Sequence, residues 1–216
     1  MKQKIADLLF FIKHRIAVLF AVCLLCYCTI VAGSRVYINA SGIGDEVMEQ
    51  VRDTIAAMDI QETDEDGESY ISVSKLAMQN IRAGMIGLFS GIVPFLCIPA
   101  IILAENAVML GAVLIPSDYL GVSALQILLY GILPHGVLEV PAMIICYACG
   151  VRICISMTAW ILKRRDWFRT RYDITNAIVT AVVIGVPLFI GAAFVESYIT
   201  PELLYRMVLA PALGLA

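Results

Sequence analysis

The sequence predicts an all-α protein of the membrane: a polytopic transmembrane helical bundle of about five crossings, with broken helices and a small acidic extracytoplasmic segment. Two observations support this prediction. The 216 residues are 61% hydrophobic and 15% charged, with a mean hydropathy of +0.88, whereas soluble domains average about 45–50% apolar and about 25% charged residues. The apolar tracts are also long and uninterrupted, unlike the short alternating strands of an outer-membrane barrel.

Residues 1–33 are predicted to be a cytoplasmic N-terminus followed by the first transmembrane helix. The ionisable residues within 1–15 are basic apart from Asp7, and Ile16–Ala32 is a hydrophobic run long enough to span a bilayer. A signal peptide has a shorter apolar core and a small-residue cleavage site, so we expect an uncleaved anchor. The positive-inside bias places this end in the cytoplasm of a multi-pass protein of the cell membrane.

Residues 34–74 are the only substantial polar segment and are predicted to lie outside the membrane. Apolar residues near helical spacing predict an amphipathic helix over Gly42–Met58, followed by a loop over Gln61–Glu68. The apolar residues of this helix are Ile43, Val47, Val51, Ile55 and Met58. The acidic residues of the segment are Asp45, Glu46, Glu49, Asp53, Asp59, Glu62, Asp64, Glu65, Asp66 and Glu68. Such a surface is either simply solvated or a docking surface. In the second case, which we expect, protein partners bind at the extracytoplasmic face.

Residues 75–201 are predicted to form the transmembrane core, and its first segment is Ala83–Ala104. Pro94 and Pro99 should kink this segment, which a membrane tolerates where neighbouring groups satisfy the freed backbone. The segment is expected to end at Glu105-Asn106. Glycines let a second helix approach closely, and those expected at helix contacts are Gly84, Gly87, Gly91, Gly111 and Gly136.

Prolines are also expected to break the next crossings. The tract Ala107–Leu133 is interrupted by polar residues at 115–121 and is predicted to be one discontinuous crossing. Pro134 biases Leu133 away from the helical conformation and suits the first turn of a new helix. A helix arriving from Leu120 should therefore stop at Leu133, and the next crossing should run from Pro134 to Leu162.

The remaining charges determine the expected topology. The basic loop Lys163–Arg171 is predicted to be cytoplasmic, and it is more simply a topology determinant than a lipid site. Asp173 and Thr175 are expected to cap the last crossing, roughly Asn176–Val195. Residues 202–216 are expected to lie along the outer interface as a short tail. Three crossings fit between the acidic segment and the basic loop, which gives five in all and an extracytoplasmic C-terminus.

His135 and Glu139 are the leading candidates for a functional site. They lie one helical turn apart in an apolar tract, and ionisable groups in membrane segments are costly and indicate function by default. A polar partner on a neighbouring helix is expected, with Glu105, Asn106 and Glu196 as candidates. The pair is either structural, or it couples transport to protons or ions beside a broken helix.

Catalysis and cofactor binding have little support in the sequence. His135 and Glu139 supply two metal ligands, whereas a hydrolytic zinc site normally needs three, so no metal, cofactor or catalytic residue is predicted. The seven cysteines all lie in apolar tracts, which favours helix packing over disulfides or a metal site. No pattern of a nucleotide-binding loop or a nucleic-acid surface is present.

Four motifs resemble those of one known family. They are Asn80 ahead of a Gly-rich helix, Glu105-Asn-Ala-x-x-x-Gly111, Pro134-His-Gly-x-x-Glu-x-Pro-Ala142 and Gly191-Ala-Ala-Phe-x-Glu-x-x-x-Thr-Pro201. Over Gln79–Pro201 the chain resembles the stage II sporulation protein M family, small polytopic membrane proteins of bacteria and archaea. The third motif is the most specific of the four. The resemblance implies an integral membrane protein of about five crossings.

The resemblance also implies a role. In endospore-forming bacteria the named member works with two cell-wall-degrading partners at the engulfing septal membrane, as the membrane anchor and not as the hydrolase. The implied function is therefore a scaffold or recruitment protein of a cell-envelope remodelling complex. The alternative is a small proton- or ion-coupled transporter centred on His135 and Glu139. Contact with membrane lipids is expected in both cases, and a homo-oligomer is compatible with both.

Overall fold

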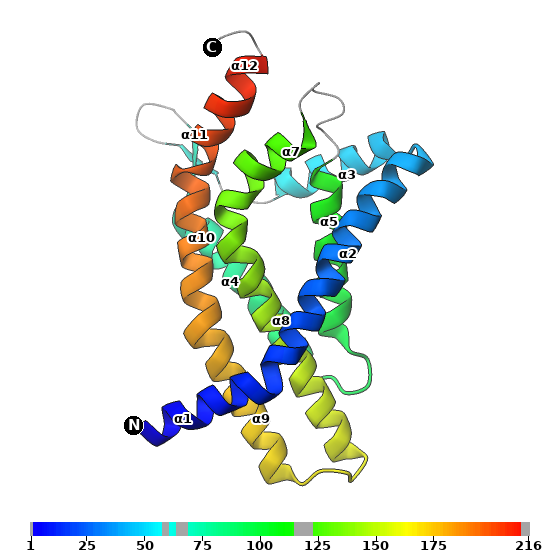
Figure 1. Cartoon of the computed structure of the whole chain (residues 1–216), viewed down its shortest axis with the longest axis vertical. Coiled ribbons are helices and arrows are strands. Elements are labelled where there is room, and N and C mark those ends of the chain that lie inside the picture. Colours follow the sequence, from blue (N-terminus) through cyan, green and yellow to red (C-terminus); the bar gives the residue numbers. More distant parts are fainter. Residues whose placement is uncertain (1, 58–60, 64–68, 115–122, 213–216) are drawn as a thin grey trace. The chain divides into compact units, whose positions relative to one another are not determined.

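The computed structural model describes residues 2–57, 61–63, 69–114 and 123–212. Over these ranges the chain is helical apart from connecting segments and two short antiparallel strands, β1 (Gln61–Thr63) and β2 (Ser69–Ile71). Among the described residues, three helical runs are long and apolar enough to cross a membrane, namely Ile5–Ser41, Ile127–Ile161 and Trp167–Tyr198. The predicted all-α membrane bundle is therefore confirmed (Figure 1).

Most helices belong to longer runs, because π-helical turns, labelled η, join successive α-helices. The helical elements are α1 (Lys2–Phe11), η1 (Ile12–Ile16), α2 (Ala17–Ser41), α3 (Gly44–Ala57), α4 (Val73–Ser90), α5 (Ile98–Val113), α7 (Ala124–Gln126), η2 (Ile127–Ile132), α8 (Leu133–Ile161), α9 (Trp167–Thr180), η3 (Ala181–Gly185), α10 (Val186–Tyr198), α11 (Thr200–Leu204), η4 (Tyr205–Leu209) and α12 (Ala210–Ala212).

The chain divides into two compact units, and the boundaries between them fall inside helices. Unit 1 comprises Met1–Tyr27, Asn80–Glu105 and Val140–Phe189. Unit 2 comprises Cys28–Gln79, Asn106–Glu139 and Ile190–Ala216.

In unit 1, one face of α4 packs closely because it carries glycines. A Cβ added at Gly87 would overlap the ring of Tyr147 on α8, which is fully buried. A Cβ at Gly91 would overlap the backbone of Gly150, and one at Gly84 would lie 2.6 Å from the ring of Phe189. Small residues on α4 and directly after it, at Gly91, therefore allow backbone-to-backbone contact with α8.

The predicted crossing Ala83–Ala104 is divided between two helices, α4 and α5. Pro94 has no N–H to continue a helix. The following residue, Phe95, adopts a positive φ of 68°, and its N–H donates to Thr158 Oγ1 at 3.0 Å. Pro94 therefore does more than kink this segment: α4 ends before it, and Pro99 stands in the first turn of α5. α5 then continues through Glu105-Asn106, which the sequence analysis placed at the end of the segment.

The expected helix stop before Pro134 is wrong. α7, η2 and α8 form one continuous run from Ala124 to Ile161. A proline in a regular helix clashes with the carbonyl four residues earlier. Here the wider π-helical turn precedes the proline, and the Leu133 N–H donates to the Leu128 carbonyl oxygen. The interruption predicted at 115–121 lies outside the described residues.

The cap predicted for the last crossing is also wrong. α9 begins at Trp167, and its N-cap is Asp166, whose Oδ1 accepts the Arg169 N–H at 2.8 Å. This hydrogen bond lowers the pKa of the Asp166 carboxyl. Asp173 and Thr175 lie inside α9 instead. The buried carboxylate of Asp173 pairs with arginines of unit 1 and does not cap a helix end.

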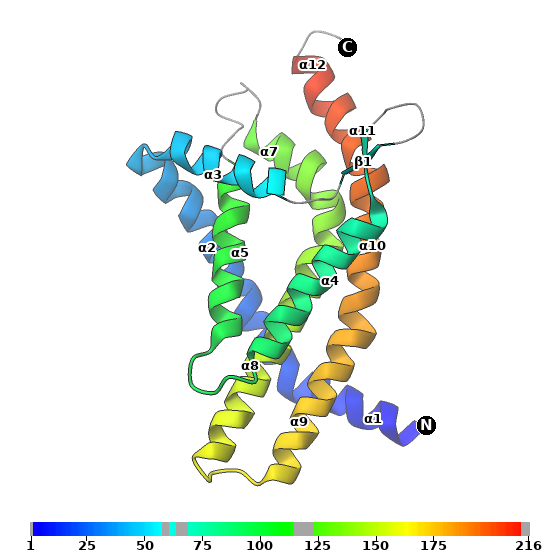
Figure 2. The same cartoon turned by 180° about the vertical axis from the view of Figure 1, so that it is seen from behind.

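In unit 2, α3 confirms the predicted amphipathic helix with slightly shorter bounds. Ile43 and Val47 pack against a cluster formed by Ile38 of α2 and Ala112 of α5. The side chains of Val51 and Ile55 are not described, and Met58 lies outside the described residues. The predicted loop Gln61–Glu68 is wrong at its start, where Gln61–Thr63 pairs with Ser69–Ile71 as a short β-ladder, and residues 64–68 lie outside the described residues (Figure 2).

Contacts within unit 2 also extend α2 beyond its hydrophobic run, as far as Ser41. Arg35 Nη1 donates to the Leu114 carbonyl oxygen at 3.0 Å. Ile38 is buried against Ala112. Tertiary contacts therefore keep this polar end helical, although its composition does not require it.

Gly111 and Gly136, the two glycines of unit 2 that were expected at helix contacts, differ in how closely they are packed. A Cβ at Gly111 would overlap the Ser34 side chain and would lie 2.8 Å from the Val31 carbonyl oxygen. A Cβ at Gly136 would meet only Ile132, at an ordinary distance of 3.7 Å. Gly111 is therefore at a close helix contact, and the structure gives no such contact at Gly136.

Candidate functional site

His135 and Glu139 lie on one face of α8, as their spacing requires. His135 Nε2 is 3.9 Å from Glu139 Oε2, too far for a direct hydrogen bond. The side chain of His135 is 13% exposed and that of Glu139 is 32% exposed. Both side chains are therefore mostly buried within the protein, and part of the Glu139 side chain stays exposed.

Thr200, at the start of α11, orients the imidazole. His135 Nδ1 is 3.2 Å from Thr200 Oγ1, and the same hydroxyl donates to the Val195 carbonyl oxygen at 3.3 Å. A hydroxyl has one proton to donate, so it accepts the hydrogen bond from Nδ1–H. The neutral ring then carries its lone pair on Nε2, the nitrogen that faces Glu139.

Glu196 of α10 completes the cluster. One ligand atom each from His135, Glu139 and Glu196 lies within 4.8 Å of the other two. In the described part of the chain, neither glutamate has a lysine or arginine partner. Two neighbouring carboxylates in an apolar segment repel each other unless they share a proton or a cation. This arrangement can therefore hold a positive charge.

The other residues selected from the sequence lie elsewhere on the helices. Glu105 is exposed on α5, and Asn106 next to it is half-buried. Asn80, on α4, has a buried side-chain nitrogen without a hydrogen-bond partner among the described residues. Thr200 was not predicted as a site residue from the sequence, although it stands in the same motif as Glu196, one turn further along.

A second polar cluster, in unit 1, was not predicted at all. Asp173 Oδ2 accepts from Arg152 Nη2 at 2.5 Å and from Ser156 Oγ at 2.6 Å, and it lies 2.9 Å from Arg165 Nη2. The side chain of Asp173 is 1% exposed. Arg152 was the available signal, since a lone arginine inside a long apolar helix requires an acidic partner.

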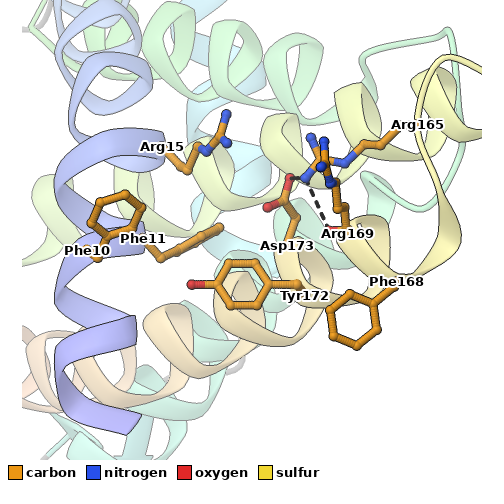
Figure 3. A pocket seen from close by; sticks show the side chains of 8 residues that line it. All are labelled: Phe10, Phe11, Arg15, Arg165, Phe168, Arg169, Tyr172 and Asp173. Carbon is orange, nitrogen blue, oxygen red and sulfur yellow. Dashed lines mark hydrogen bonds and ion pairs between the residues drawn. The ribbon is translucent and has the colours of Figure 1, made fainter. Parts of the chain in front are cut away.

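Beside this cluster unit 1 has a cavity of about 240 Å³ (Figure 3). Arg15 enters it from η1, and Tyr172 and Phe11 approach each other edge to face, with ring centroids 6.1 Å apart. The lining residues are Phe10, Phe11, Arg15, Arg165, Phe168, Arg169, Tyr172 and Asp173. Aromatic rings and arginines together are typical of the boundary between the apolar bilayer and its polar surface.

Comparison with known proteins identifies the family. The family described as stage II sporulation protein M matches residues 16–201. The chain belongs to the stage II sporulation protein M family. The match includes the His135 cluster and the Asp173 cluster, so both lie in the region that defines family membership. The resemblance expected from the four motifs is therefore confirmed.

One similar protein is archaeal. An uncharacterized protein of Methanocaldococcus jannaschii is 34% identical over 91 residues, which are 42% of this chain and 51% of that protein. The chain thus spans about half the length of this relative. No solved structure matches the chain.

Proposed function

We propose that the chain is a multi-pass membrane scaffold that recruits a partner protein through the outer, acidic face of α3. Membership of the stage II sporulation protein M family supports a membrane component of this kind. The observation that carries the proposal is the attachment of α3. Its apolar residues Ile43 and Val47 hold it against α2 and α5, which leaves its acidic residues directed outward.

The proposed topology has five crossings, made by α2, α4, α5, the run α7–α8 and the run α9–α10. The basic N-terminal residues and the basic loop after α8 both lie in the cytoplasm, and α3 and the C-terminus lie outside. α4 has 18 residues and α5 has 16, which corresponds to lengths of about 27 Å and 24 Å. The length of α4 is within about 3 Å of the hydrocarbon thickness of about 30 Å, and α5 is about 6 Å shorter than it.

The acidic face of α3, defined as Asp45, Glu46, Glu49 and Asp53, determines the chemistry of the partner. All four side chains are exposed. Like charges on one face attract an oppositely charged surface and raise the rate of encounter. The proposed partner is therefore an extracytoplasmic protein with a basic surface, held by a contact that weakens with salt.

The transporter alternative is not favoured by the family match. The His135 cluster supplies groups that bind a positive charge, but carriage across the membrane also needs access from both sides in turn. Self-association of the chain and its specific contacts with lipids are predictions from the sequence.

Neutralising the acidic face of α3 should weaken recruitment without unfolding the protein. A photo-crosslinking residue at Gln50, which is exposed on α3, would report the partner in intact cells. The variant D45N/E46Q/E49Q/D53N should reduce the crosslinked product about fourfold or more. Each exposed charge contributes about 0.2–1 kcal/mol, so the four together contribute about 0.8–4 kcal/mol, and 1.4 kcal/mol is tenfold.

The matched control is E202Q, which neutralises an exposed carboxylate of α11, on the extracytoplasmic side in the proposed topology. This control should keep the crosslinked product at the parent level, and mass spectrometry should identify a protein with a basic extracytoplasmic surface. Undiminished crosslinking of the α3 variant, or products formed only with lipid or with a second copy of the chain, would refute the proposal.

A further inference from the structure

The cluster at His135 has the composition of a metal site, which the sequence analysis did not predict. The sequence motif supplies two ligands, and a third was lacking. Glu196 now provides that third ligand from α10. We propose that His135, Glu139 and Glu196 bind a divalent transition-metal ion that links α8 to α10. This proposal is independent of partner recruitment by α3.

The orientation of the imidazole supports a metal ligand rather than an ordinary hydrogen bond. Thr200 takes up Nδ1–H, and its own proton goes to the Val195 carbonyl oxygen. A ring nitrogen that ligates a metal normally has its other N–H held in this way. Nε2 is left with a free lone pair that faces the oxygen of Glu139 at 3.9 Å. Two electron-rich atoms face each other there, and a cation between them removes the repulsion.

The separations fit an ion after small side-chain movements. Zinc binds imidazole nitrogen at about 2.0–2.1 Å and carboxylate oxygen at about 2.0–2.2 Å, which places tetrahedral ligands about 3.3 Å apart. The three ligand atoms lie within 4.8 Å of one another, so modest torsional changes of the glutamates close the shell. The partly exposed side chain of Glu139 leaves a position for water as a fourth ligand.

Charge and donor type indicate the class of ion. Two carboxylates carry two negative charges, and no described lysine or arginine neutralises them. A divalent ion balances both. One imidazole with two carboxylates suits zinc, cobalt or manganese, whereas magnesium and calcium prefer oxygen ligands alone.

The test uses the full chain purified in detergent, stripped with a chelator and dialysed against Co²⁺ or Zn²⁺. The parent should retain one ion per chain, and its Co²⁺ spectrum should lack the charge-transfer band of thiolate ligands. This band matters because the chain has seven cysteines. An excess of Mg²⁺ should not displace the ion.

Variants assign the ligands. E139Q and E196Q keep side-chain size and should each weaken binding by at least about 100-fold, and T200V should weaken it by about 10–100-fold, the usual effect of removing the group that holds a ligating histidine. The control E202Q removes an exposed carboxylate that pairs with Arg206 and should bind as the parent does.

Three results would overturn the proposal: no retained ion in the parent, a thiolate band in the Co²⁺ spectrum, or binding that E139Q and E196Q leave unchanged. Zinc-dependent thermal stabilisation provides a second readout, since a ligand that binds only the folded state raises the melting temperature. It should appear in the parent and in E202Q and be absent from E196Q. Equal stabilisation of all three proteins would also contradict the site.

Discussion

Replacing Asp173 by asparagine should lower the free energy of unfolding by about 3–5 kcal/mol. Asp173 is buried and lies 2.5 Å from Arg152 and 2.9 Å from Arg165. The amide keeps the size of the side chain but removes its charge, so two guanidinium groups remain inside unit 1 without a counter-ion. The loss is measured by denaturant or thermal unfolding in detergent.

The matched control for Asp173 is an exposed ion pair. Glu202 pairs with Arg206, and both side chains are more than half exposed, so Glu202→Gln should change stability by about 0–1 kcal/mol. A rescue gives a further check: adding Arg152→Met to Asp173→Asn should recover part of the loss, because it removes one of the unpaired buried charges. A change of similar size at Asp173 and Glu202 would show that the buried cluster does not stabilise the fold.

Replacing Gly91 by alanine should cost about 1–3 kcal/mol, the usual cost of overpacking. The added Cβ would overlap the backbone of Gly150 on α8, and backbone atoms cannot move aside by changing rotamer. Gly87→Leu should be at least as damaging, since its Cβ would overlap the buried ring of Tyr147. Both effects are measured as the yield of folded protein and its melting temperature in detergent.

Gly33 provides the control for this prediction. It lies in α2, and a Cβ there would meet nothing within 4 Å. Gly33→Ala should therefore raise stability by about 0.5–1 kcal/mol, because alanine favours a helix over glycine. If Gly91→Ala and Gly33→Ala change the melting temperature in the same direction, close contact between α4 and α8 is not what Gly91 provides.

The membrane fold and its family could be predicted from the sequence because they depend on composition and local motifs. Long apolar runs predict membrane helices whatever their neighbours are. The amphipathic spacing of Ile43 and Val47 likewise predicted α3, which the structure confirms. Such features depend only on residues that are close together in the sequence.

The errors concern features that depend on tertiary contacts. Pro134 was expected to stop a helix, and a π-helical turn accommodates it. Asp173 was expected to cap a helix because caps are commonly acidic, whereas the nearby Asp166 caps it and Asp173 binds two arginines. A cap and a buried counter-ion have the same sequence signature, so only the fold distinguishes them.

Part of the candidate site could also be predicted from the sequence, because it depends on local spacing. The spacing of His135 and Glu139 places them on one helical face without knowledge of the fold. Glu196 was one of three acceptable partners, and nothing local separated it from Glu105 or Asn106. Thr200 could be recognised only after the packing of unit 2 brought its hydroxyl to 3.2 Å from His135.

The proposal that α3 acts outside the membrane is tested most directly by labelling single cysteines in intact cells. All seven native cysteines are replaced, and one cysteine is introduced at the exposed position Glu49 or at the exposed position Arg164. A membrane-impermeant thiol reagent should label position 49 without permeabilisation and position 164 only after it. Labelling of position 164 from outside, with position 49 protected until the membrane is opened, would contradict the topology and with it recruitment by the acidic face of α3.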